Sequence, residues 1–222
     1  MKQRDRETRE RLLKAAARLF ADRGFKRVTV RDICRTARAN VAAVNYHFGN
    51  KLGLYREVLQ IAIDALRSTT DAAKQAAEGC KADEKLRRFV HVYLRRLLAT
   101  PDDWIHRLIN REMADPTPVL DALVNQGMRP RIEYLSGIVA ELLGCGPHDP
   151  RVRRSVASIQ SQSVAYLPNP LAARLGLKSK LTPAEIDEVA RHIAEFSLAG
   201  IKAIGAIGTI GAVADGEVSR HA

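Results

Sequence analysis

Hydrophobic residues recur along this chain with the spacing of α-helices. The first predicted helix carries one apolar face and a basic remainder, and Gly24 follows as a C-terminal stop. That face consists of Leu12, Leu13, Ala16, Leu19 and Phe20. No run bounded by turn residues alternates with a period of two, as a β-strand would. The pattern predicts an all-α protein.

Two short helices follow the first one, each with its own start signal. Thr29 can cap a helix of about two turns, and Asp32 three residues later completes a variant of the capping box. After a three-residue connection, Asn40 can cap residues 41–48, and a break at Gly49 precedes a long helix. Two short helices joined by a tight turn are the geometry that places a second helix in the DNA major groove.

The positive charge is concentrated in the same part of the chain. Of a net charge of +11, residues 1–60 supply +9, from 15 Lys and Arg against 6 Asp and Glu. A basic module followed by a nearly neutral remainder is typical of a protein in which only one part meets a polyanion. A basic helical face that is merely solvated remains the alternative at this point.

Several function classes are excluded by what the chain lacks. Its three cysteines, Cys34, Cys80 and Cys145, form no disulfide framework, which favours a reducing cytoplasm. No signal peptide and no membrane-spanning segment are predicted. Gly-rich phosphate loops, nucleophile motifs and clustered histidines are missing, so we expect no enzyme, no cofactor and no metal site.

The segment VTVRDICRTARANVAAVNYHFGNKLGLYREVL resembles the DNA-binding part of the TetR family of bacterial transcriptional regulators. The resemblance implies phosphate contacts by Thr29 and Arg31 near the start of the second helix. It places Asn40, Val41, Ala42 and Asn45 on the groove-facing side of the third helix, and Tyr46, His47 and Lys51 against the DNA backbone. Val44 and Phe48 are expected in the core. Asn40 serving only as a cap, and Tyr46 only covering the bundle, are alternatives.

Arg38 occupies a turn position at which the family often has glycine, as suits a positive φ. A non-glycine residue there carries a strain of about 1 kcal/mol, unless the turn is built differently. Our hypothesis is that Arg38 adds a phosphate contact, so that Arg38→Gly lowers the salt dependence of DNA binding by about one unit.

The rest of the chain reads as amphipathic helices separated by Pro and Gly breaks, and Thr182-Pro183-Ala184-Glu185 is a clear helix start. This part is similar to the C-terminal domain of the CerR-like TetR subgroup, which implies a dimer formed by helices at about 150–167 and 183–207. Candidates for an effector pocket are Trp104, Arg107, Leu108, Arg111, Met128, Tyr134 and Tyr166. The alternative is that these residues are core, with Arg111 and Glu112 as structural partners.

We therefore predict a three-helix helix-turn-helix DNA-binding domain at residues 1–50, continuing into the helix from residue 50. A larger helical domain for effector binding and dimerisation follows at 51–212, and then a disordered tail at 213–222. The predicted function is a homodimeric, ligand-responsive transcriptional regulator. It is expected to repress at an inverted-repeat operator of double-stranded DNA and to be released by a small-molecule effector. The alternative is a protein that coats DNA without sequence preference.

Overall fold

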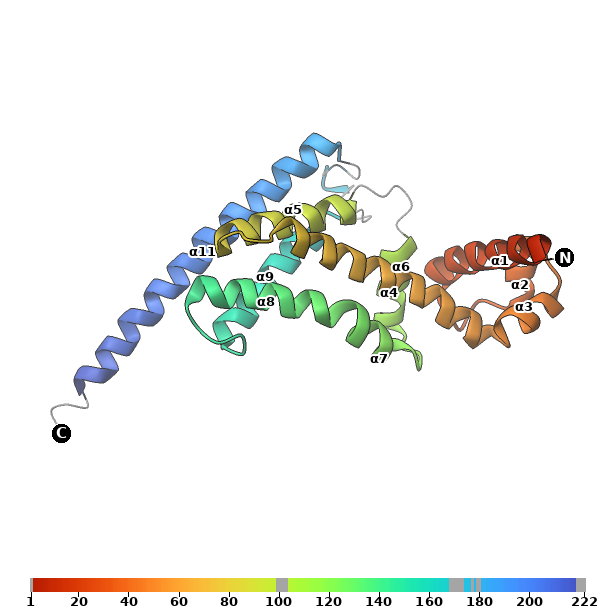
Figure 1. The fold of residues 1–222 in the computed structure, drawn as a ribbon, viewed down its shortest axis with the longest axis horizontal. Coiled ribbons are helices and arrows are strands. Elements are labelled where there is room, and N and C mark those ends of the chain that lie inside the picture. Colours follow the sequence, from red (N-terminus) through yellow and green to blue (C-terminus); the bar gives the residue numbers. More distant parts are fainter. Residues whose placement is uncertain (1, 99–103, 168–173, 177, 179–180, 219–222) are drawn as a thin grey trace. The chain divides into compact units, whose positions relative to one another are not determined.

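The computed structural model describes residues 2–98, 104–167, 174–176, 178 and 181–218, and every regular element in these residues is a helix, as the periodicity predicts. The chain forms two compact units (Figure 1). The first unit combines Met1–Arg67 with Asp102–Arg129, and the second combines Ser68–Pro101 with Pro130–Ala222. None of the described helices is long and apolar enough to span a membrane.

The first unit is built on α1 (Lys2–Arg23), α2 (Val30–Ala37), α3 (Val41–Phe48) and the first part of α4 (Lys51–Ala76). Gly24, with φ of +77°, ends α1 as the sequence predicts. Phe25 then turns back onto the core, where its ring centroid lies 4.8 Å from that of Tyr55. Phe20 meets the same tyrosine edge to face at 4.8 Å. This aromatic cluster holds α1 against α4, and α2 and α3 bury Ile33 and Val44 in the same core.

A later segment completes the first unit: α6 (Trp104–Ala114), α7 (Leu120–Ala122) and the π-helix η1 (Leu123–Met128). Glu112 of α6 is 1% exposed, and its carboxylate accepts a hydrogen bond of 2.5 Å from the Tyr55 hydroxyl. The backbone N–H and the hydroxyl of Thr117 each donate to the other carboxylate oxygen at 2.8 Å. Because Leu108 and Ile109 also enter the core of α1–α4, residues 104–129 pack with these helices. The predicted boundary at residue 50 therefore differs from the compact units of the structure.

The second unit contains the rest of α4, α5 (Ala82–Leu98), α8 (Arg129–Leu143), α9 (Pro150–Ala165) and α11 (Pro183–Val218). In its core Leu86, Leu135, Ile159 and Ile193 come from four different helices. The predicted capping box at Thr182 is present, since Thr182 N–H donates to Glu185 at 2.8 Å and Glu185 N–H donates to the Thr182 hydroxyl at 3.3 Å. The structure continues α11 to Val218, past residue 213 where the sequence predicts a disordered tail, and residues 219–222 lie outside the described part.

Candidate nucleic-acid interface

The first turn of α2 is held by the capping box that the sequence predicts. The Thr29 hydroxyl accepts from Asp32 N–H at 3.1 Å, and the Asp32 carboxylate accepts from Thr29 N–H at 3.1 Å. The Thr29 hydroxyl also donates to this carboxylate at 2.6 Å, and this bond together with the one from Thr29 N–H lowers the pKa of Asp32 below its ordinary value. Thr29 and Arg31 are both exposed at this helix N-terminus, where the helix dipole favours a phosphate.

The turn between α2 and α3 has the left-handed backbone expected of a glycine position. Arg38 has φ of +50° and ψ of +50°, and it is the one non-glycine residue with positive φ in the described chain. Its N–H donates to Arg35 O at 3.4 Å, and Ala39 N–H donates to Cys34 O at 3.0 Å, which closes the end of α2. The turn therefore keeps the usual geometry, with the strain located at Arg38 and its side chain exposed.

The residues of α3 lie on two faces, one exposed and one buried. Val44 and Phe48 are buried, as predicted, and fix the helix to the bundle. Val41 is 42% exposed and Tyr46 78% exposed, and Ala42 and Asn45 lie on the same exposed side. The exposure of Tyr46 excludes the alternative that its ring covers the bundle.

The two asparagines of this segment differ in what their side chains can still bind. The Asn40 side-chain oxygen accepts from Ala42 N–H at 3.0 Å, so Asn40 is the N-cap of α3 and its acceptor is in use. Asn45 is exposed, and its amide makes no hydrogen bond with the described residues. Bidentate pairing with an adenine needs both the amide oxygen and the amide nitrogen. Asn45 is therefore the better placed of the two for base recognition.

The junction of α3 and α4 positions the remaining candidates. Lys51 Nζ lies 4.3 Å from the centroid of the Phe25 ring, and its partial burial lowers the pKa of the ammonium group. The His47 ring lies between those of Tyr46 and Phe48, with centroid distances of 4.9 and 5.9 Å. Both side chains are partly exposed.

Sequence reasoning missed the role of Gly53 at this junction. A Cβ atom at Gly53 would lie 2.0 Å from Phe48 O, so only glycine lets the first turn of α4 approach the end of α3. The sequence shows a glycine two residues after Lys51. The need for glycine there comes from the close approach of the backbones of residues 48 and 53, which the sequence alone does not show. A side chain at residue 53 would therefore force the end of α3 and the start of α4 apart.

Comparison with known proteins agrees with this geometry. Residues 12–58 match the family model described as bacterial regulatory proteins, tetR family. Residues 82–201 match the model of the C-terminal domain of the HTH-type transcriptional dual regulator CecR, which covers more than half of the chain.

The chain belongs to the TetR family.

The CerR-like subgroup expected from the sequence is the CecR subgroup, and the family consists of transcriptional regulators rather than enzymes. The dual regulator CecR of Shigella flexneri is 27% identical over 169 residues, which are 72% of this chain and 75% of that protein. The regulator TtgR of Pseudomonas putida is 36% identical over 77 residues, 35% of each chain. A TetR-family regulator from Streptomyces coelicolor has the same fold, with a TM-score of 0.63 at 20% identity over 88% of this chain and 96% of that one.

Five of the seven effector-pocket candidates of this TetR-family chain make structural contacts in the first unit. Leu108 is fully buried, and Trp104 and Met128 pack against the same core. Arg107 forms an ion pair of 3.3 Å with Asp22, and Arg111 donates to Asp22 O at 2.9 Å. The partner of Arg111 is thus Asp22 at the end of α1, and Glu112 bonds to Tyr55 and Thr117 instead.

The other two candidates belong to the second unit. Tyr134 lies beside Phe89, with ring centroids 6.1 Å apart. Tyr166, at the end of α9, lines a mostly apolar cavity of about 420 Å³ together with Lys178, Leu181 and His192 of α11. The structure therefore places the candidates in several different surroundings.

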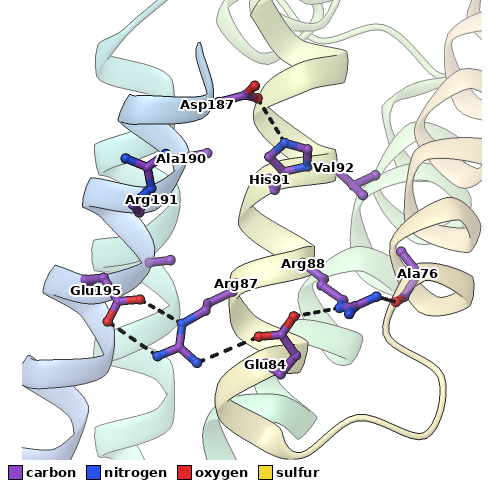
Figure 2. A pocket seen from close by; sticks show the side chains of 11 residues that line it. Ala76, Glu84, Arg87, Arg88, His91, Val92, Asp187, Ala190, Arg191 and Glu195 are labelled. Carbon is purple, nitrogen blue, oxygen red and sulfur yellow. Dashed lines mark hydrogen bonds and ion pairs between the residues drawn. The ribbon is translucent and has the colours of Figure 1, made fainter. Parts of the chain in front are cut away.

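A second cavity of the same unit, of about 510 Å³, lies between α5 and α11 (Figure 2). Figure 2 shows that its walls are tied together by ion pairs. Arg87 binds Glu195 at 2.7 Å, and His91 binds Asp187 at 2.9 Å. Most basic groups of this cavity face acidic partners within the chain. These contacts hold α5 and α11 together.

Proposed function

We propose that the protein binds an inverted-repeat operator as a homodimer, represses transcription there, and leaves the DNA when a small molecule binds its second unit. The observation that carries the proposal is the division of α3. Val44 and Phe48 hold the helix from inside, while Val41, Ala42 and Asn45 present methyl and amide groups outward. Such groups distinguish thymine methyls and adenine edges in the major groove.

Exposed basic and backbone groups around α3 support the same proposal. Arg31 and Arg38 are exposed and form no ion pair with a described residue, and Thr29 and Lys51 lie at the starts of α2 and α4. We assign these four residues, with Tyr46 and His47, to phosphate contacts that orient α3. Since the proposed target is chromosomal DNA, the protein would act in the cytoplasm.

The apolar surface of the second unit supports a dimer. Phe196 is 64% exposed and Ile204 36% exposed on α11, and Val164 on α9 is 42% exposed. Exposed apolar side chains on two helices of one unit are typical of an interface with a second copy. A dimer also explains how one short helix per protomer gains specificity, because two α3 helices one DNA turn apart bind one site jointly.

Selection of bound duplexes from a random pool at about 150 mM salt tests the DNA part, because non-specific binding is weak there. We expect enrichment of an inverted repeat, and loss of that enrichment in Asn45→Ala. A sequence-independent DNA-coating protein would recover no motif, and the proposal would then be withdrawn.

Sedimentation of Phe196→Glu tests the dimer. We expect this variant to be monomeric. The matched control is Met113→Glu, at a 59% exposed apolar position of the first unit, which should remain dimeric. A Phe196→Glu protein that sediments as a dimer would contradict the proposed interface.

A further inference from the structure

Arg131, in the first turn of α8, is a partly buried cation without an anionic partner in the described chain. Its Cζ lies 4.7 Å from the centroid of the Tyr93 ring of α5, and its Nη2 donates to Gln160 Oε1 of α9 at 3.3 Å. Its Nε is buried and has no hydrogen-bond partner. A guanidinium stays charged at any physiological pH and offers five N–H donors, of which one is used here.

Three other arginines of the second unit show the usual partner of a guanidinium. Arg87, Arg95 and Arg151 are each paired with a carboxylate on the protein surface, at distances of 2.5–2.8 Å. Arg131 contacts only a ring and one amide oxygen, and its Nε is buried. Buried polar groups are nearly always bonded, so a buried N–H left without an acceptor calls for an explanation. The acceptor that best fits a guanidinium edge is a carboxylate or a phosphate.

The surroundings of Arg131 narrow the choice between these anions. Phe89 and Tyr93 stack with centroids 6.0 Å apart and an interplanar angle of 16°, and Tyr134 packs against Phe89. Lys74 Nζ lies 5.7 Å from the Tyr134 centroid and supplies a second cation. Three aromatic rings beside two cations suit a ligand with an aromatic body and one acidic group, since rings bind rings by stacking and edge contacts.

We propose that Arg131 binds the carboxylate of a small aromatic acid, and that this acid is the effector of the regulator. The aromatic body of the acid packs against Tyr134, the partly exposed ring of the cluster, which rests on the buried Phe89 ring. The carboxylate takes the N–H groups that Gln160 does not use. This inference rests on the proposed function, because it names the effector class of the same regulator.

The contact between Arg131 and Gln160 can link effector binding to release of the DNA. Gln160 belongs to α9, one of the two helices assigned to the dimer interface. A carboxylate bound at the other N–H groups of Arg131 draws the guanidinium away from Gln160 and so weakens the contact between α8 and α9. The free energy of binding can therefore favour an arrangement of the dimer that fits the operator less well.

The test measures melting of the full chain with cinnamate and benzoate, and with cinnamamide and benzamide as neutral counterparts at matched ionic strength. We expect the carboxylates to raise Tm saturably, the amides to leave it unchanged, and cinnamate to lower the affinity for the selected operator. Equal stabilisation by the amides, or by inorganic phosphate, would overturn the assignment of an aromatic acid. No response to either carboxylate would overturn it as well.

Arg131→Met is the decisive variant, and Arg129→Met is its control on the same helix turn, because Arg129 is exposed and donates only to Asn125. We expect the Kd for cinnamate to rise at least tenfold in Arg131→Met and to stay unchanged in Arg129→Met, with Arg131→Lys between them. Without ligand, Arg131→Met should melt at the same temperature or higher, since it loses a buried unbonded donor. A drop of more than about 3 °C would make Arg131 a structural residue and overturn the proposal.

Failure here is distinguishable from failure of the proposed function. Operator selection needs no ligand. An enriched inverted repeat without a carboxylate response overturns only the effector class, whereas a pool without enrichment overturns the regulator itself.

Discussion

Replacing Arg38 by glycine should stabilise the protein while weakening its DNA binding. Arg38 holds φ of +50° and ψ of +50°. That conformation costs an L-residue about 1–2 kcal/mol, and glycine avoids the cost but loses about 0.5–1 kcal/mol more backbone entropy on folding. The expected net gain is therefore about 0.5–1 kcal/mol, which raises Tm by roughly 1–4 °C in a chain of this size.

The same substitution removes one cation per protomer from the proposed interface. Each phosphate contact adds about 0.9 to the slope of log K against log salt, so the two Arg38 side chains of a dimer account for about 1.8. Between 50 and 200 mM salt this difference corresponds to a roughly 12-fold change in relative affinity. A change of that size is well within the range of fluorescence anisotropy on a labelled operator.

Arg38→Ala separates the charge from the backbone strain. Alanine retains a Cβ atom, so Arg38→Ala should show the same decrease in the slope of log K against log salt as Arg38→Gly, but no gain in stability. If both variants keep the wild-type slope, Arg38 contacts no phosphate. If Arg38→Gly melts below the wild type, the left-handed turn carries no strain, and the structural argument fails.

Three further perturbations test separate parts of the molecule. Asn45→Ala should weaken the free energy of binding to the selected operator by about 1–3 kcal/mol and leave binding to random DNA unchanged. An equal loss of affinity for both DNAs, measured by anisotropy, would show that Asn45 contacts only the DNA backbone. Tyr55→Phe removes the hydrogen bond to the buried Glu112 carboxylate and should lower the free energy of unfolding, measured in urea, by about 1.5–3 kcal/mol. The control is Tyr46→Phe, at an exposed ring, which should change this free energy by less than about 0.5 kcal/mol. Hydrogen bonds from Lys178 and Thr182 hold the pKa of Glu185 at about 2 instead of 4.5, so its stabilising contribution is complete above pH 4.5 and is lost as the pH falls towards 2. The Tm difference between wild type and Glu185→Gln should therefore shrink as the pH is lowered from 6 to 2, and a difference that is constant with pH would contradict this assignment.

Local signals in the sequence determined the helices and where several of them begin. The apolar period predicted an all-α chain, and Thr29 with Asp32 and Thr182 with Glu185 marked two helix starts that the structure confirms. These signals are reliable because a capping bond joins residues only three positions apart. The resemblance to the TetR family implied that Val44 and Phe48 lie in the core and Asn45 on the outer side of α3, and the burial of these residues agrees.

Only the tertiary structure decided which distant segments lie together. Glu112 bonds to Tyr55, and Arg131 lies on the Tyr93 ring, although neither pair is close in the sequence. A short-range pattern shows that a side chain faces inward, but the partner it meets depends on how whole helices pack. For that reason the sequence determined the helices of the first unit, whereas its effector candidates are divided between core contacts, surface ion pairs and a separate cavity.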